Sequence, residues 1–284
     1  MRKEFALVFL LMLVSAMLIP YGCTDKKPEP TDTTQVDSVF VDTTAQDSTE
    51  NVIAETPMPK AADELFDDFI FNFAANRKLQ QSRIVFPLPV YRDGKLEKKM
   101  NKQQWQMEHF FMRQGYYTLI LDNQKQKDRV KDTAVNHVEI EKIFLKKETV
   151  QTYTFNKVNG EWKMTAIHFQ PLAKNRNANF LKFYNQFSTD SAFQVQSMAG
   201  EVEFTAPDPE DDFSTISGVI VPQQWFDFRP GIIPSGLLYN VLYGRKHVNS
   251  DHRILVIRGI ANGLEMEMTF RRIGGHWKLI EFNS

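Results

Sequence analysis

Two stretches of this chain, YTFNKVNGEWKM (Tyr153–Met164) and MTFRRIGGHWKL (Met268–Leu279), follow one pattern. In each, a strand-like run is interrupted by Asn-Gly or Gly-Gly, and a second strand-like run that contains Trp-Lys follows. A Gly-containing dipeptide between two such runs is typical of a β-hairpin. The sequence therefore predicts one structural unit present twice, with an antiparallel hairpin at the end of each copy.

The upstream parts of the two copies also match, in the same order. LFDDFIFNF (Leu65–Phe73) and NFLKFYNQF (Asn179–Phe187) each carry apolar residues at the i, i+3, i+4 and i+7 spacing of an amphipathic helix. A second short helical stretch, a Gln-Gln-Trp segment and a strand that starts after a glycine follow in both copies. The nearly constant offset predicts two repeats, at residues 61–173 and 174–284.

Helices that precede a run of hairpin-linked strands indicate an α+β fold. We expect the helices of each repeat to pack on a curved antiparallel sheet, with Met266 and Met268 on a buried face and alternate residues such as Glu267 facing water. Two helices, a strand, a short helix and a long meander ending in Gly-x-Trp-Lys resemble the nuclear-transport-factor-2-like (NTF2-like) cone fold, also called cystatin-like. The resemblance implies two tandem cone domains, whose open ends often hold a pocket.

The N-terminus predicts export. A basic start and an apolar run shorter than the roughly 20 residues that span a bilayer indicate a signal peptide at residues 1–22. Cys23, the only cysteine of the sequence, resembles the lipid-accepting cysteine of bacterial lipoproteins, although Tyr21 and Pro20 depart from that motif. The alternative is a secreted protein with an incidental cysteine. We expect a protein lipid-anchored to the outer membrane, on a periplasmic or surface face that the sequence does not decide.

Residues 23–60 are rich in Thr, Ser, Asp and Pro and predict a disordered tether. A repeated Asp-Ser/Thr pattern in it resembles the acceptor pattern of a bacterial O-glycosylation system, which implies glycan sites at Thr33, Ser38, Thr43 and Ser48. A plain acidic linker is the alternative. The signal, the tether and the doubled Phe-rich unit together resemble an uncharacterised family of Gram-negative lipoproteins, known only as a domain of unknown function.

Charge and motif content exclude several kinds of partner. The formal net charge of −1 gives no basic face, so we expect no nucleic acid. No cluster of ligating side chains has metal-site spacing, so we expect no metal and no cofactor.

His109 lies four residues after Trp105, and on a helix the two would share one face. A base at a pocket mouth and a half-buried structural histidine both fit. Asp67 and Asp68 are expected on a solvated helix face.

These observations favour a non-catalytic binding protein of the cell envelope. It would hold a small apolar ligand in a cone, or dock an envelope protein on apolar Pro-rich loops. The candidate pocket residues are Trp105, His109, Trp162, Trp225, Trp277, Met266 and Met268. The alternative is an isomerase or dehydratase-type enzyme with a His or Asp base in one cone. A titratable side chain in a cone, within hydrogen-bond reach of a polar partner, would favour the enzyme.

Overall fold

The fold is described from a computed structural model that covers residues 59–284 apart from residues 209, 245–249 and 261. The predicted signal peptide, Cys23, almost all of the tether and its glycosylation candidates lie outside the described residues. The described residues belong to one compact unit. Within them, no helix combines the length and the apolar character that a membrane span requires.

The described residues form the predicted mixture of short helices and long strands. The helices are η2 (Lys60–Asp63), α3 (Phe66–Ala75), α4 (Arg77–Arg83), η3 (Lys102–Gln104), η4 (Phe110–Arg113), η5 (Gln124–Lys131), η6 (Leu172–Lys174), α5 (Ala178–Phe187), α6 (Ser191–Gln196), η7 (Pro222–Gln224) and α7 (Trp225–Phe228). The strands are β1 (Leu88–Arg92), β2 (Lys95–Met100), β3 (Tyr116–Leu121), β4 (His137–Phe144), β5 (Thr149–Val158), β6 (Glu161–Pro171), β7 (Met198–Asp208), β8 (Asp211–Ile220), β9 (Leu237–Tyr243), β10 (His252–Gly259), β11 (Glu265–Ile273) and β12 (His276–Asn283). The α+β fold class is confirmed.

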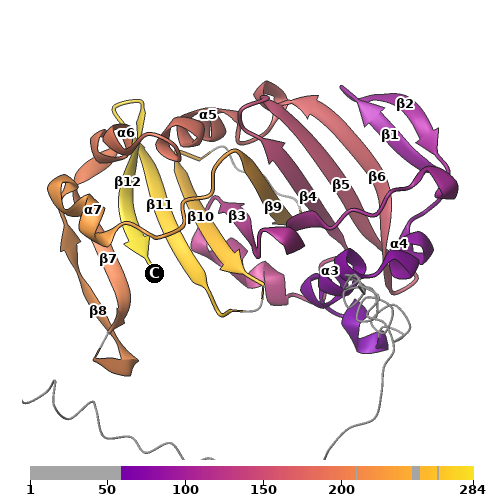
Figure 1. Ribbon diagram of the computed structural model, residues 1–284, viewed down its shortest axis with the longest axis horizontal. Coiled ribbons are helices and arrows are strands. Elements are labelled where there is room, and N and C mark those ends of the chain that lie inside the picture. Colours follow the sequence, from indigo (N-terminus) through magenta and orange to yellow (C-terminus); the bar gives the residue numbers. More distant parts are fainter. Residues whose placement is uncertain (1–58, 209, 245–249, 261) are drawn as a thin grey trace, which may run out of the picture. The chain divides into compact units, whose positions relative to one another are not determined.

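The two repeats exchange one strand. The strands described form a single sheet in the order β2-β1-β6-β5-β4-β9-β3-β10-β11-β12-β7-β8 (Figure 1). β4 of the first repeat pairs with β9 of the second, and β10 of the second pairs with β3 of the first. We expected a separate sheet in each repeat. Instead, each half is completed by a strand of the other half, which ties the two repeats into one sheet.

The exchange also decides which face each repeat covers. β3 and β9 pair in parallel at the centre, and the strand order is mirrored about them, so a half-turn about an axis along the strands relates the repeats. A half-turn of this kind turns the sheet over. Accordingly, Ile254 and Val256 of β10 join the core of the first repeat, whereas Leu255 and Ile257 join the core of the second. The helices of the two repeats therefore cover opposite faces.

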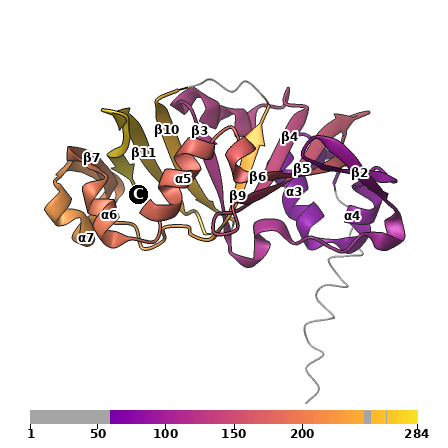
Figure 2. The same ribbon diagram turned by 90° about the horizontal axis from the view of Figure 1, so that it is seen from above.

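Each half packs the aromatic stripe of its first helix against its terminal hairpin. Phe66 of α3 lies 5.0 Å from the ring of Trp162, and Phe180 of α5 lies 5.4 Å from the ring of Trp277. Trp162 on β6 and Trp277 on β12 thus occupy equivalent strands. Figure 2 shows α3 and α4 beside the half of the sheet that holds β2, and α5 and α6 beside the half that holds β7.

The predicted water-facing side of β11 is covered. Glu267 and Thr269 are 6% and 2% exposed, although the alternation predicted that they face water. The reason is η5, whose Gln124 and Lys127 side chains bind the Glu267 carboxylate. η5 belongs to the first repeat and follows the exchanged strand β3, so no pattern within β11 itself could predict this cover.

Candidate functional site

One buried glutamine in each repeat holds the tryptophan of the Gln-Gln-Trp segment. Gln80 Oε1 on α4 accepts a hydrogen bond from Trp105 Nε1 (3.0 Å), and Gln194 Oε1 on α6 accepts one from Trp225 Nε1 (2.9 Å). Each glutamine amide also donates to a backbone carbonyl of the preceding helix. The same contact therefore positions the segment around the tryptophan in both halves.

In the first repeat this glutamine prevents the helix that we expected between Trp105 and His109. The Gln80 side chain bonds to both the backbone N–H and the carbonyl of Glu108, which are then not free for a helical ladder. Residues 105–109 are irregular as a result. His109 is half-buried, precedes η4, and shares no helix face with Trp105.

The neighbouring Glu108 is instead the centre of a polar cluster. Its Oε2 accepts hydrogen bonds from the Tyr153 hydroxyl on β5 (2.7 Å) and from Lys142 Nζ on β4 (2.8 Å). Its Oε1 accepts from a backbone N–H (3.1 Å) and from the Tyr239 hydroxyl on β9 (3.4 Å). Gln151 donates to the Tyr153 hydroxyl (2.7 Å). Because β9 is an exchanged strand, the second repeat completes this cluster of the first.

The electrostatics of the cluster keep Glu108 ionised. Burial opposes its ionisation, but the hydrogen bonds from Lys142 and Tyr153 outweigh that effect and hold the pKa of Glu108 below its usual value. Burial and the nearby Glu108 carboxylate raise the pKa of Tyr153 and of Tyr239, so both hydroxyls stay protonated. The pKa of Lys142 is raised because its bond to Glu108 outweighs its desolvation. The cluster is a neutralised ion pair with two hydroxyl donors.

A pocket of about 370 Å³ opens beside the cluster. Its polar lining includes Glu108, Gln151 and Tyr153. Its apolar lining comprises Val90, Met100, Trp105, Ile167 and Phe169. At the rim, the Arg92 guanidinium lies 5.0 Å from the centre of the Phe169 ring and pairs with Glu97 (2.9 Å). An apolar wall with one polar region suits a small ligand that has an apolar part and a polar group.

The described residues of the second half form no such cluster. Sequence alignment of the repeats and the strand pairing match Glu108 with Phe228, Lys142 with Ile257, Gln151 with Met266, Tyr153 with Met268, and Tyr239 with Thr118. Met266 and Met268 are 6% and 0% exposed, so apolar packing fills this position. The pocket described in the second half, about 350 Å³, lies between α6 and the loop after α7, and no strand residue lines it.

Of the predicted pocket residues, Trp105 lines the pocket of the first cone. Trp162 lies in the hydrophobic core of the first half, and Trp225, Trp277, Met266 and Met268 lie in that of the second. None of these core residues, nor the half-buried His109, is among the residues that line the pockets described here.

Asp67 does not lie on a solvated face, contrary to our expectation, whereas Asp68 is exposed. The Asp67 carboxylate accepts hydrogen bonds from the hydroxyls of Tyr117 on β3 (3.1 Å) and Tyr243 on β9. Burial raises the pKa of Asp67 by more than these two hydrogen bonds lower it. Both tyrosines come from the exchanged strands, so the helix pattern alone could not reveal them.

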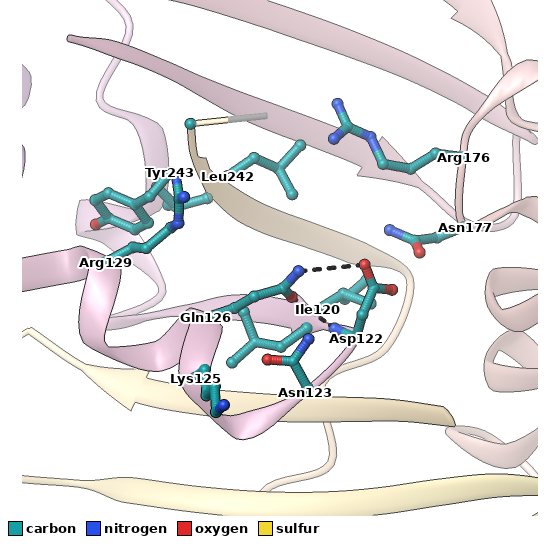
Figure 3. A pocket seen from close by; sticks show the side chains of 13 residues that line it. Ile120, Asp122, Asn123, Lys125, Gln126, Arg129, Arg176, Asn177, Leu242 and Tyr243 are labelled. Atoms are coloured by element: carbon teal, nitrogen blue, oxygen red, sulfur yellow. Dashed lines mark hydrogen bonds between the residues drawn. The ribbon is translucent and has the colours of Figure 1, made fainter. Parts of the chain in front are cut away.

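A further pocket, of about 380 Å³, lies where the exchanged strands meet. Figure 3 shows Asp122 bonded to Gln126 on one side of it and Arg176 on the other. Asp122 pairs with Arg253 (3.0 Å), and Arg176 pairs with Glu139 (3.0 Å). Each ion pair neutralises one charged residue of the lining. The pocket therefore offers a ligand less net positive charge than its arginine and lysine residues suggest.

Glu108, Lys142, Tyr153 and Tyr239 were not predicted as site residues. One signal was available: the aligned hairpins differ at Tyr153 and Met268, where one copy is polar and the other is not. Lys142 and Tyr239 could not be assigned, because they belong to different repeats and meet only through the strand exchange. Within the described part of the chain, no group of three or more His, Cys, Asp or Glu side chains could hold a metal ion.

Comparison with known proteins gives a family and a fold. A family profile described as a domain of unknown function (DUF4348) matches residues 45–284. A crystal structure of an NTF2-like protein from Bacteroides fragilis is 39% identical, with a TM-score of 0.73; the match covers 80% of this chain and 98% of that chain. No curated protein matches. The predicted NTF2-like resemblance is confirmed, and neither description states an activity.

Proposed function

We propose, for a chain that belongs to the DUF4348 family, a non-catalytic binding function in which the first cone holds a small amphiphilic ligand. The observation that supports this proposal is the pocket beside Glu108, which joins an apolar wall to a hydrogen-bonded polar cluster. The apolar body of a ligand would pack on Ile167 and Phe169, and a hydroxyl or amide group would reach Gln151 or Tyr153. The NTF2-like fold is used by both binders and enzymes and does not decide between them.

The state of the carboxylates weighs against catalysis. A general base must have a lone pair available for the substrate proton and a pKa near the working pH. Glu108 has a lowered pKa, and its two oxygens already accept four hydrogen bonds. Asp67 has a raised pKa, but it lines none of the pockets described here, so a substrate in one of those pockets does not meet its carboxylate. Glu108 therefore lacks the free lone pair and the pKa of a base, and Asp67 lacks access to a pocket.

The location is a separate part of the proposal. We propose that the protein is exported and anchored to the outer membrane by a lipid on Cys23, with the Thr- and Asp-rich tether between the lipid and the folded unit. Thr33, Ser38, Thr43 and Ser48 remain candidates for glycosylation of that tether. Cell fractionation of a Cys23→Ala variant tests the anchor: the variant should leave the membrane fraction, and a variant that stays with the membranes would contradict it.

Ligand binding can be tested with 4-propylphenol, which has one apolar arm and one hydroxyl group. Calorimetric titration should show binding to the wild-type protein. Gln106→Trp, at an exposed rim position of the pocket, should fill the pocket and weaken binding at least about tenfold, or about 1.4 kcal/mol.

The matched control is Phe226→Trp, because Phe226 follows Trp225 as Gln106 follows Trp105. This variant should bind 4-propylphenol as the wild-type protein does. Equal weakening by both variants, or wild-type affinity in Gln106→Trp, would contradict the assignment of the ligand to the first cone.

A further inference from the structure

The pocket where the exchanged strands meet is built by three separate segments of the chain. β3 and β9, which pair in parallel, contribute apolar side chains to it, among them Leu121 and Leu242. η5 contributes Arg129, and the connection between the repeats contributes Arg176 and Asn177. None of these five residues lines the pocket of the first cone. The two pockets are therefore separate sites.

Asn177 is buried in this pocket, and Arg253 orients its amide group. Asn177 is 3% exposed and stands at the N-cap of α5, yet its side chain caps no N–H of that helix. Its Oδ1 instead accepts a hydrogen bond from Arg253 Nε (3.1 Å). Because a guanidinium group donates and never accepts, this bond turns the amide oxygen toward Arg253 and the amide nitrogen away from it.

The amide nitrogen of Asn177 is left for the pocket. Nδ2 has no hydrogen-bond partner within the described ranges, and Figure 3 shows the side chain directed into the pocket. A buried amide donor needs an acceptor, and a ligand in the pocket can supply one. The geometry therefore favours a ligand that carries an acceptor oxygen.

The lining of this pocket keeps an excess of positive charge. The two ion pairs described above neutralise Asp122 and Arg176. The other cations of the lining, Lys125 and Arg129, form no ion pair with any residue that the structure describes. Arg129 lies across the pocket from Asn177 (Figure 3). A concave site lined by uncompensated positive charge attracts an anion.

We propose that this pocket binds a small organic anion with a single carboxylate group. One carboxylate oxygen would accept a hydrogen bond from Asn177 Nδ2, and Arg129 would balance the charge. The apolar part of the ligand would pack on Leu121 and Leu242. The carboxylate of Asp122 lines the same pocket, so a doubly charged phosphate would meet more repulsion there than a singly charged carboxylate.

Calorimetric titration with hexanoate tests this proposal, at about 0.15 M salt so that distant charges are screened. The wild-type protein should bind hexanoate, and hexylamine, a cation of the same chain length, should not compete. Asn177→Asp keeps an acceptor for Arg253 but replaces the free donor with a negatively charged oxygen. It should weaken hexanoate binding at least about tenfold. Binding of 4-propylphenol should be unchanged in this variant, because Asn177 does not line the pocket of the first cone.

A second pair of variants tests the charge without touching a buried residue. Arg129→Gln should weaken hexanoate binding severalfold, because it removes a cation of the lining. The matched control is Lys131→Gln, since Lys131 is also an exposed cation of η5 but does not line the pocket. This control should bind hexanoate as the wild-type protein does. Circular dichroism establishes that each variant is folded, and Arg129→Gln decides the test if Asn177→Asp is not.

Four results would overturn the proposal. The wild-type protein could fail to bind hexanoate at millimolar concentration, or folded Asn177→Asp could bind it as tightly as the wild-type protein. Arg129→Gln and Lys131→Gln could have equal effects on hexanoate binding. Hexylamine, or inorganic phosphate at a lower concentration than hexanoate, could displace hexanoate from the protein.

Discussion

The two cones of this protein share a backbone plan but differ in what they place at its centre. In the first, Glu108 binds Lys142 and two tyrosine hydroxyls beside a pocket. In the second, Phe228, Ile257 and the two methionines of β11 occupy the matching positions. The buried Gln–Trp contact is the same in both. The repeats therefore keep the contacts that shape the cone and differ in the groups that a ligand would meet.

The difference also shows what a partly buried ion pair requires. Removing a carboxylate and an ammonium group from water is costly unless every lone pair and proton finds a partner. In the first cone, the donors to Glu108 come from β4, β5, β9 and the backbone. The exchanged strand β9 supplies Tyr239, whereas β3 supplies the smaller Thr118 to the second cone. The different residues on the two exchanged strands thus contribute to the difference between the two cones.

The largest expected effect comes from breaking the polar cluster. Glu108→Gln leaves Lys142 without its counter-charge and should lower the free energy of unfolding by about 2 to 3 kcal/mol at neutral pH. Chemical denaturation measures this loss. In the Glu108→Gln, Lys142→Met double variant the loss should be smaller than the sum of the single losses. Additive losses would show that the two side chains do not stabilise each other.

Tyr153 and Met268, the aligned residues of the two hairpins, give the next comparison. Tyr153→Phe removes one donor to Glu108 and one acceptor from Gln151, and should lower the free energy of unfolding by about 1 to 2 kcal/mol. Met268→Leu changes only packing and should cost about 1 kcal/mol or less. Equal losses in urea denaturation would argue against a special polar role for the first cone.

A third comparison concerns the two tryptophans of the terminal hairpins. Trp277 Nε1 donates to Asn179 (2.8 Å), whereas Trp162 Nε1 is buried without a partner among the described residues. Leu65 is the residue of the first repeat that aligns with Asn179. Leu65→Asn should therefore stabilise the protein by about 1 kcal/mol, and Asn179→Leu should destabilise it by a similar amount. Thermal unfolding of both variants checks the opposite signs.

The smallest effect is a difference in pH dependence between two carboxylates. The lowered pKa of Glu108 means that its stabilisation is present above the ordinary Glu value, about 4.3, and is lost as the pH falls through the folded-state pKa. The raised pKa of Asp67 has the opposite consequence, since stability falls as the pH rises from about 3.9 through the folded-state pKa.

Unfolding measured from pH 3 to pH 7 separates these two contributions. Relative to the wild-type protein, Glu108→Gln should become less stable as the pH rises, and Asp67→Asn should become more stable. Parallel pH profiles for the two variants would contradict the assigned shifts.

The sequence predicted much of the local structure. The aligned hairpins around Trp162 and Trp277 and the aromatic stripes that include Phe66 and Phe180 correctly indicated equivalent helices and strands. These patterns are local, and burial of one face dictates them. The sequence could not predict which strands pair with each other. The equivalent strands β3 and β9 have similar patterns, so either one suits β4 as a pairing partner.

The candidate site depends on the pairing of β9 with β4. Tyr239 reaches Glu108 only because β9 pairs with β4, and no spacing within either repeat brings the two residues together. The irregular conformation after Trp105 had a similar cause, since a side chain of α4, Gln80, binds the backbone there. Long-range partners of this kind override local helix propensity.

The most direct test of the difference between the cones is a crystal structure of the protein soaked with 4-propylphenol. The account predicts density in the first cone, with the ring against Phe169 and the hydroxyl oxygen within hydrogen-bond distance of Gln151 or Tyr153, and no density beside Met266 and Met268. Density beside the two methionines, or an empty first cone in crystals whose protein binds 4-propylphenol in solution, would contradict it.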